Sequence, residues 1–266
     1  MAEAWKQNRR KADYFQSNIV ALSSFLPDCD YGTHEVSPNG KRAVMSCIKP
    51  FQNTKMYIMD VEKPSSNKLL EGAEEAHIPF DLPELSYEIV KLPSGYEVHI
   101  GIMKPPKFDP TLKYPLLVDV YGGPNSCKVR QSTPNPNMIH FCSTLGAVVA
   151  WIDGRGSSNR GWNLKAPVYK ALGQFETIDT IDAVKWVIYR APQWFTSASL
   201  LPLCKSFALD NVHFQNSALL AETLQGELVH FTQLVYSNQD HSMGSRQAHL
   251  FMEIGRFLSE ECFSED

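Results

Sequence analysis

A histidine beside an aspartate near the end of the chain is the residue best suited to proton transfer. His241 follows Asp240 in the segment SNQDHSM, between the apolar stretch FTQLVYS and a long amphipathic stretch. An imidazole on such a loop can take the proton of a serine or cysteine nucleophile when a carboxylate holds its ring. Asp210, upstream in DNVHF, has the chain order for that carboxylate, although its spacing suits a helix cap better. The pattern predicts acyl-transfer chemistry, with an ordinary exposed loop histidine as the alternative.

A tyrosine at the end of an apolar stretch could stabilise the charge that develops in such a reaction. Tyr121 stands in VYGGPN, where a predicted strand ends and a Gly-Gly-Pro turn begins. Ligands bind at the carboxyl edge of α/β sheets, and a tyrosine hydroxyl there can donate to an oxyanion. A core tyrosine before a turn is the alternative. The later loop DGRGSSNRG is a flexible turn rather than a phosphate loop, because it lacks the Lys-Ser/Thr ending and the G-x-G-x-x-G spacing.

The nucleophile that His241 would activate is missing from its expected place. It belongs between a helix that ends near Arg190 and the acid, on a strand-to-helix turn that reads Gly-x-Ser-x-Gly. The chain contains neither this motif nor Gly-x-Cys-x-Gly. The hydroxyl and thiol candidates between residues 191 and 209 all lack a flanking glycine; they are Ser197, Ser199, Cys204 and Ser206. We therefore expect no serine nucleophile in this chain.

The composition excludes several classes of partner. The 266 residues are 43% hydrophobic and 20% charged, with a net charge of -4 and a pI of about 6.1, so no basic field is expected to attract nucleic acid. No apolar run approaches membrane-spanning length, and the first residues lack the apolar core of a signal peptide. Neither a Cys-x-x-Cys pair nor a histidine cluster is present, so we expect no metal and no cofactor.

The first part of the chain has the pattern of antiparallel β structure. Residues 34–47 predict one hairpin around a Pro-Asn-Gly turn, and residues 55–61 predict a further strand with alternating apolar residues. Residues 62–72 have the composition of a turn-rich linker, and residues 86–106 predict a second hairpin. Because the first hairpin brings its ends together, Cys29 and Cys47 could pair as a disulfide, or they could be two buried thiols.

From Tyr114 onward, apolar strands alternate with helical patterns. Residues 114–122 and 146–156 predict strands buried on both faces. Residues 177–190 predict a helix whose apolar face is formed by Ile178, Ile181, Val184 and Ile188. The remaining predicted elements are a helix over 213–226, a strand over 231–237 and a terminal helix over 247–262. This alternation predicts a mostly parallel α/β sheet.

Residues 191–209 fit no element, because Pro202 interrupts the only apolar run that could form a strand. If a central strand is missing here, the strand over 114–122 is separated from the one over 231–237. The exposed edges must then find new partners or aggregate.

Five collinear motifs resemble the dipeptidyl peptidase IV branch of the prolyl oligopeptidase family; they are KYPLLVDVYGGP, DGRGS, LGQFETIDTIDAVKW, DNVHFQNSA and DHSM. The resemblance runs from about residue 29 to the C-terminus, apart from the stretch around 191–207. It implies an incomplete α/β-hydrolase-like sheet over residues 72–266. A remnant of a β-propeller blade precedes it over residues 29–71, after a lead-in over residues 1–28.

Matching residues imply specific roles. Tyr121 matches the family's oxyanion tyrosine, His241 its triad histidine, and Asn211 an asparagine that contacts the substrate's N-terminal residue. Cys29 and Cys47 match a propeller disulfide. Cys262 matches half of a second disulfide whose partner falls in the missing stretch. The resemblance also implies peptide substrates, a possible homodimer, and a membrane-anchored or extracellular location, for which this chain shows no signal peptide or anchor.

The departures from the family pattern concern catalysis. The triad acid position holds Leu209, so Asp210 lies one residue off, and the nucleophile turn is absent with several tens of residues after it. Most of the propeller, which would read the free amine of a substrate, is also absent. We therefore expect a serine dipeptidyl peptidase domain, of the kind that releases X-Pro or X-Ala dipeptides, without activity. The alternatives are a non-catalytic binding or regulatory variant and an unstable truncated splice product.

Overall fold

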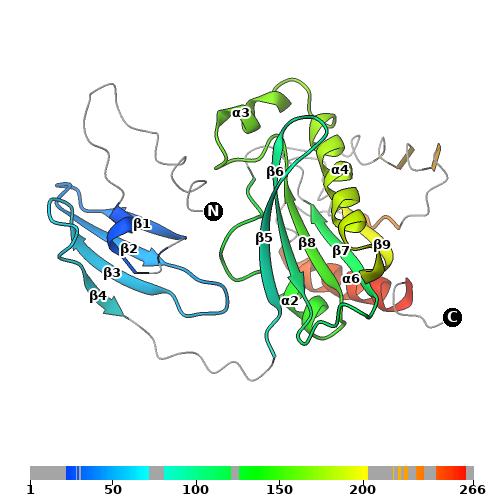
Figure 1. Ribbon diagram of the computed structural model, residues 1–266, viewed down its shortest axis with the longest axis horizontal. Helices are drawn as coiled ribbons and strands as arrows, with labels where there is room; N and C mark the ends of the chain where they lie inside the picture. Colours follow the sequence, from blue (N-terminus) through cyan, green and yellow to red (C-terminus); the bar gives the residue numbers. More distant parts are fainter. Residues whose placement is uncertain are drawn as a thin grey trace.

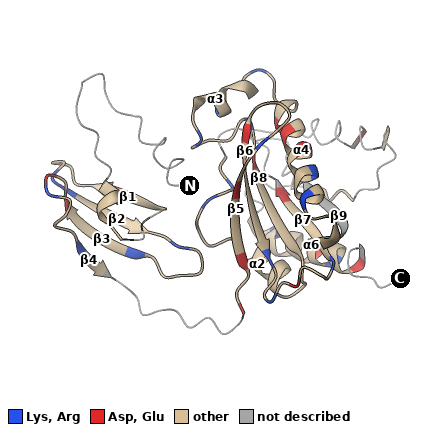
Figure 2. Cartoon of the chain, viewed as in Figure 1, with Lys and Arg blue, Asp and Glu red and all other residues tan. Residues whose placement is uncertain are grey.

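The computed structural model describes residues 22–27, 29, 31–71, 81–120, 126–202, 218, 221–222, 225–226, 232–236 and 244–261. These residues form two sheets, one of four strands in the order β1-β2-β3-β4 and one of five strands in the order β5-β6-β8-β7-β9 (Figure 1). Charged residues of both signs are spread over both sheets rather than gathered in one region (Figure 2).

The four-stranded sheet is an antiparallel meander with its own small core. Its strands are β1 (Gly32–Val36), β2 (Arg42–Cys47), β3 (Lys55–Asp60) and β4 (Lys68–Glu71). Alternate residues of β2 and β3 are buried, and they pack with Leu26 and Cys29, which lie at and just after the short helix η1 (Leu22–Phe25). The hairpin and the strand predicted here are confirmed. The prediction of a linker over 62–72 is wrong in part, because β4 pairs with β3 along the free edge of that strand.

The five-stranded sheet combines antiparallel and parallel pairing. Its strands are β5 (Glu84–Lys91), β6 (Glu97–Lys104), β7 (Tyr114–Val120), β8 (Val148–Asp153) and β9 (Phe195–Pro202). The predicted hairpin forms β5 and β6, and β6 continues antiparallel to β8. Strands β8, β7 and β9 are parallel to one another. Their carboxyl ends therefore meet at one edge, which is the edge where α/β sheets bind ligands.

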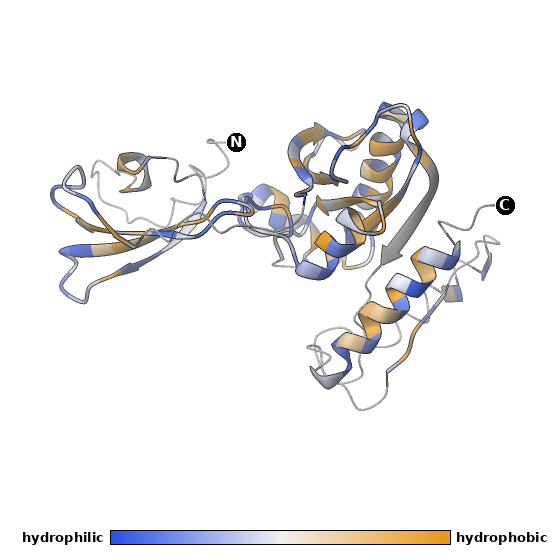
Figure 3. Cartoon of the chain, turned by 90° about the horizontal axis from the view of Figure 1, so that it is seen from below, coloured by the Kyte–Doolittle hydropathy of each residue, from blue (hydrophilic) through white to orange (hydrophobic). Residues whose placement is uncertain are grey.

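Helices cover both faces of this sheet, which explains why β7 and β8 are apolar apart from one aspartate in each. On one face, Ala183, Val184 and Val187 of α4 (Phe175–Arg190) pack on alternate residues of β6, β7 and β8. On the other face, α2 (Pro136–Ser143) and α6 (Gln247–Glu261) pack on the intervening residues. The apolar and polar bands of α6 are visible from below (Figure 3). The shorter helices are α3 (Trp162–Lys165), η2 (Ala166–Val168), η3 (Pro192–Trp194) and η4 (Gly244–Arg246).

The helix predicted over 177–190 is confirmed, but its buried face differs from the prediction. Ile178 and Ile181 are 48% and 44% exposed. The buried positions in their place include Asp179, which is fully buried. The Asp179 carboxylate can lie on this buried face because it pairs with Arg155. The spacing of apolar residues alone cannot predict such a pair.

Two predictions about the later strands are wrong. Residues 195–202 form β9, which pairs in parallel with β7, so a strand does lie beside β7. Pro202 is the last residue of β9, where its missing N–H group interrupts no further pairing. Residues 232–236 lie in the predicted strand over 231–237, yet they adopt no strand. The described residues of the helix predicted over 213–226 are helical.

Candidate functional site

Two of the predicted or candidate residues follow, in the chain, the carboxyl ends of parallel strands. Val120 ends β7 and is paired with Pro202, the last residue of β9. Tyr121 follows Val120 directly in the chain, and Cys204 follows Pro202 by two residues. Tyr121 itself lies outside the described residues, as do four other predicted site residues: Leu209, Asp210, Asn211 and His241. The structure therefore describes the strand ends that precede Tyr121 and Cys204 in the chain.

A buried carboxylate on β7 organises the first side of this edge. The side chain of Asp119 is 6% exposed and accepts hydrogen bonds from Lys128 Nζ at 3.0 and 3.1 Å. Trp151 Nε1 on β8 donates to the same carboxylate at 3.0 Å. Because Asp119 lies on the face opposite Val118, it points to the side that α2 and α6 cover. The lysine neutralises the charge of Asp119 and ties residue 128 to the end of β7.

A second buried carboxylate, at the end of β8, holds the same returning chain through its backbone. Asp153 is 1% exposed and accepts the N–H groups of Lys128 and Val129, each at 2.9 Å. Arg160 Nη2 lies 3.5 Å from this carboxylate and also donates to the carbonyl oxygen of Val129. Hydrogen bonds to an ionised buried acceptor are stronger than neutral ones. The chain before residue 121 is thus held in β7, and the chain from Lys128 onward is held by Asp153.

A third ion pair fixes the loop after β8 to the start of α4. Arg155 and Asp179 form a buried pair with an Nη2–Oδ1 distance of 2.6 Å, and Asp179 also accepts the backbone N–H of Arg155 at 2.8 Å. A side chain at Gly154 would bring a Cβ within 2.8 Å of the Asp179 Cβ, so glycine is required for this approach. The Arg155 guanidinium lies between the rings of Tyr96 and Phe175, at 4.8 and 4.5 Å from their centroids.

An open hollow of about 590 Å³ lies beside this ion pair. Three of its lining residues are aromatic, and none is charged; they are Tyr96, Trp162, Asn163, Ala166, Pro167 and Phe175. Tyr96 directly precedes β6, which is antiparallel to β8, so the hollow opens at the same edge as the carboxyl ends of the parallel strands. Its lining suits an apolar or aromatic group of a ligand.

Two titratable groups lie against the Asp153 cluster. Burial and the nearby positive charge of Arg160 lower the pKa of His99 to about 4. Burial, and next the negative charge of Asp153, raise the pKa of the Cys127 thiol. At neutral pH, His99 is therefore uncharged and Cys127 is a thiol rather than a nucleophilic thiolate. Among the residues that the structure describes, no group of three or more acidic, cysteine or histidine side chains could hold a metal ion.

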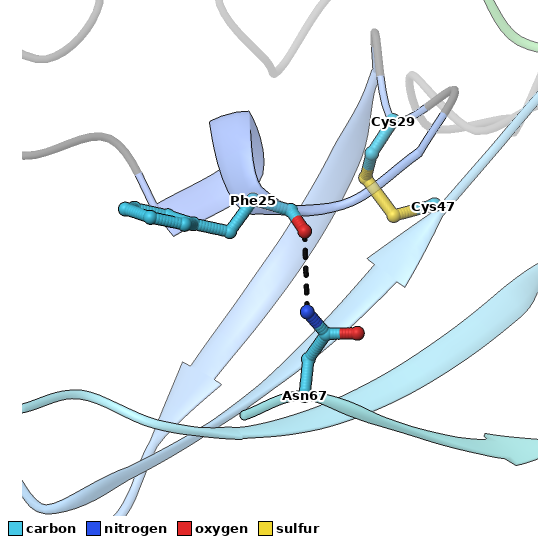
Figure 4. Close-up of a disulfide and its surroundings, with 4 residues drawn as sticks. All are labelled: Phe25, Cys29, Cys47 and Asn67. Carbon is cyan, nitrogen blue, oxygen red and sulfur yellow. Dashed lines mark hydrogen bonds between the residues drawn. A yellow bond between two sulfur atoms is a disulfide. The ribbon is translucent and has the colours of Figure 1, made fainter. Parts of the chain in front are cut away.

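Cys29 and Cys47 form a disulfide in the four-stranded sheet, with a Cα–Cα distance of 5.0 Å (Figure 4). Near it, Asn67 Nδ2 donates to the carbonyl oxygen of Phe25 at 3.1 Å and ties η1 to the segment just before β4. Cys262, for which the sequence predicted no partner, lies outside the described residues.

The sequence analysis did not identify Asp119, Asp153, Lys128 or Arg160. A signal was available for the two aspartates, since each is a charged residue within or at the end of an otherwise apolar strand. Such a residue is rarely buried unless it is paired. No sequence pattern indicated the partners, because they come from separate loops.

None of the helices in the described ranges is long and apolar enough to cross a membrane.

Comparison with known proteins finds similarity to peptidases. Residues 135–201 match the model of the Prolyl oligopeptidase family. The chain is 32% identical to Dipeptidyl peptidase family member 2 of Caenorhabditis elegans, over 94% of this chain and 39% of that protein. It is 26% identical to Prolyl endopeptidase FAP of Homo sapiens, over 89% of this chain and 41% of that protein. It thus spans about two fifths of the length of the curated relatives that it matches.

The fold is shared with a solved peptidase. Dipeptidyl peptidase 4 of Porphyromonas gingivalis matches with a TM-score of 0.67 at 21% identity, over 85% of this chain and 43% of that chain. The predicted fold class is confirmed: an incomplete α/β-hydrolase-like sheet preceded by a remnant of a propeller blade.

Proposed function

Because the chain belongs to the prolyl oligopeptidase family and is dipeptidyl peptidase-like, we propose that it is a serine peptidase domain without catalytic activity. The observation that carries this proposal is the absence of a Gly-x-Ser-x-Gly turn from the whole sequence. The reaction that the family resemblance implies is the release of N-terminal X-Pro or X-Ala dipeptides.

The position of β9 supports the absence of a nucleophile. Ser199 is paired with Leu117 inside the strand, and Ser197 lies in the same strand. A nucleophile of this class has to stand on a sharp turn at the strand's carboxyl end, with backbone amides gathered around it. Of the four candidate residues, only Cys204 and Ser206 follow that end, and neither has a flanking glycine.

The alignment with the C. elegans relative supports an internal deletion. That alignment is 325 residues long, although it includes only 94% of this 266-residue chain, so the relative has residues that face gaps here. The triad acid position also holds Leu209, which has no carboxylate to orient His241. Two of the three triad groups are therefore absent from their family positions.

The test is hydrolysis of a Gly-Pro chromogenic substrate together with labelling by a fluorophosphonate probe. We expect no labelling of any serine and no turnover above that of the heat-denatured chain. An intact oxyanion site without its triad retains roughly 10³–10⁴ of rate over water, far below a working peptidase. Cys204→Ala and Ser206→Ala serve as matched controls. Stoichiometric labelling that either substitution abolishes would show that a nucleophile exists after β9.

The second candidate function is that of a peptide-binding variant, and the hollow near Arg155 favours it. Three aromatic rings at the carboxyl edge provide a surface for an apolar peptide side chain without any need for a nucleophile. We propose peptides as the ligand class, a homodimer by analogy with the family, and a division into a blade remnant at 29–71 and a hydrolase-like part at 72–266.

The third candidate, an unstable truncated product, is distinguished by circular dichroism and a melting curve. The two apolar clusters on the sheet faces support a cooperative fold. A non-cooperative melt of the full chain would favour the unstable product instead.

A further inference from the structure

One loop of the four-stranded sheet reaches the α/β part of the molecule. The loop over 48–54 joins β2 to β3, and Phe51 at its centre has a φ of 60°. This left-handed conformation is unfavourable for a bulky residue and persists where surrounding contacts hold it. Two such contacts exist: the backbone N–H of Phe51 donates to Thr133 Oγ1 at 3.0 Å, and the half-buried ring packs against the apolar cluster of α2, α6 and the adjoining sheet face.

Phe51 contacts the segment that follows the candidate site in the chain. We name residues 126–133 the anchor segment. Asp153 binds two of its backbone amides, and Val129 belongs to the apolar cluster on which Phe51 packs. Tyr87 Oη donates to the carbonyl oxygen of Arg130 at 3.1 Å. The anchor segment is therefore held by the five-stranded sheet near its beginning and by Phe51 at its end.

The other end of the Phe51 loop is attached to the disulfide. Strand β2 ends at Cys47, and the N–H of the next residue, Ile48, donates to the carbonyl oxygen of Tyr31 at 2.8 Å. Both cysteines are buried. Only three residues separate Cys47 from Phe51, so the disulfide limits how far the base of the loop can move.

We propose that Phe51 is a latch through which the disulfide-bonded four-stranded sheet keeps the anchor segment in one conformation. Loss of the ring, or of the disulfide at the base of its loop, releases the end of the anchor segment. This coupling does not depend on whether the chain hydrolyses peptides.

Cys127 provides a reporter within the anchor segment itself. Its thiol is half-buried, and its raised pKa makes it slow to alkylate while the segment is closed. In the full chain, the rate of Cys127 alkylation, located by peptide mass spectrometry, and hydrogen–deuterium exchange over 126–133 both measure opening. In Phe51→Ala we expect both to rise about five- to thirty-fold, the range for a modest loss of local free energy. The double replacement of Cys29 and Cys47 by serine should raise them in the same direction by a smaller factor.

Two further variants separate the latch from a general loss of stability. Thr133→Val removes the acceptor of the Phe51 N–H at nearly constant volume, and it should raise exchange over 126–133 while β6 and α4 stay protected. Tyr169→Ala, at a site that is 77% exposed and away from this contact, should change nothing. The proposal is overturned if Phe51→Ala leaves exchange over 126–133 and Cys127 alkylation unchanged. It is also overturned if exchange rises equally in β6, α4 and the anchor segment.

Discussion

At the residue scale, buried charge is concentrated where the parallel strands end. Asp119 and Asp153 lie within or at the end of β7 and β8, and Asp179 faces the loop that follows β8. Each carboxylate has a cation beside it and at least one N–H donor, so the cost of burying it is largely offset. Sequence patterning cannot predict such groups in full, because a partner such as Lys128 or Arg160 becomes a neighbour only after folding.

Removing one member of a buried pair should be strongly destabilising. We expect Asp179→Ala to lower the free energy of unfolding by about 3–5 kcal/mol, because Arg155 is then left buried without its counter-charge. Urea denaturation followed by circular dichroism measures the loss. Lys185→Ala, at an exposed position of the same helix, is the control and should be within about 0.5 kcal/mol of the parent. A loss for Asp179→Ala as small as that of the control would contradict the role given to the pair.

His99 should make stability depend on pH in mildly acidic solution. Its pKa is about 4 in the folded chain, below its ordinary value of 6.5, because burial and Arg160 disfavour the charged ring. Between these values the unfolded chain binds a proton that the folded chain does not, so stability falls as the pH falls. From about pH 7 to about pH 5 the parent should lose roughly 1–2 kcal/mol more than His99→Gln. If the urea midpoints of the parent and of His99→Gln change equally with pH, the lowered pKa of His99 is contradicted.

At the element scale, local pattern predicted the elements that are long, apolar or regularly spaced. Strands β7 and β8 and helices α4 and α6 lie where the sequence placed them. Strand β9 was not predicted because a proline argues against a central strand. Pro202 is the last residue of β9, however, and at that position its missing N–H group does not disrupt the strand pairing. Strand β4 was missed because its flanking residues are turn formers, and only its pairing with β3 gives it strand structure.

The disulfide should be the main stabiliser of the four-stranded sheet beyond its small core. Cys29 and Cys47 are 18 residues apart in sequence, and closing a loop of that size contributes about 3 kcal/mol in the chain-entropy model. We expect the Cys29→Ser, Cys47→Ser double variant to lose about 2–4 kcal/mol of this sheet's stability. Exchange of the β2 and β3 amides is the measurement, and the amides of β6 and β8 are the internal reference. Unchanged protection of β2 and β3 would mean that their core suffices alone.

At the scale of the whole molecule, the described chain is two separately cored sheets in contact through one loop. Methionine, tyrosine and cysteine side chains fill the smaller core, while the larger sheet is covered on both faces by helices. The sequence predicted the first hairpin and the buried strands β7 and β8, including the end of β7 that Tyr121 follows in the chain. It could not predict that Phe51 would bridge the two sheets, because that contact joins residues 82 positions apart through a loop without a pattern of its own.

The strand order also has a consequence in time. In the sheet, β7 lies between β8 and β9, both of which follow it in the chain. A ribosome that adds about 5–20 residues per second has produced β7 several seconds before β9 can emerge to complete its pairing. At the start of that interval this almost wholly apolar strand has neither of its final neighbours, and after β8 has been made, its other edge stays unpaired until β9 emerges. We therefore expect this protein to need a chaperone most during its synthesis, before β7 has paired on both edges.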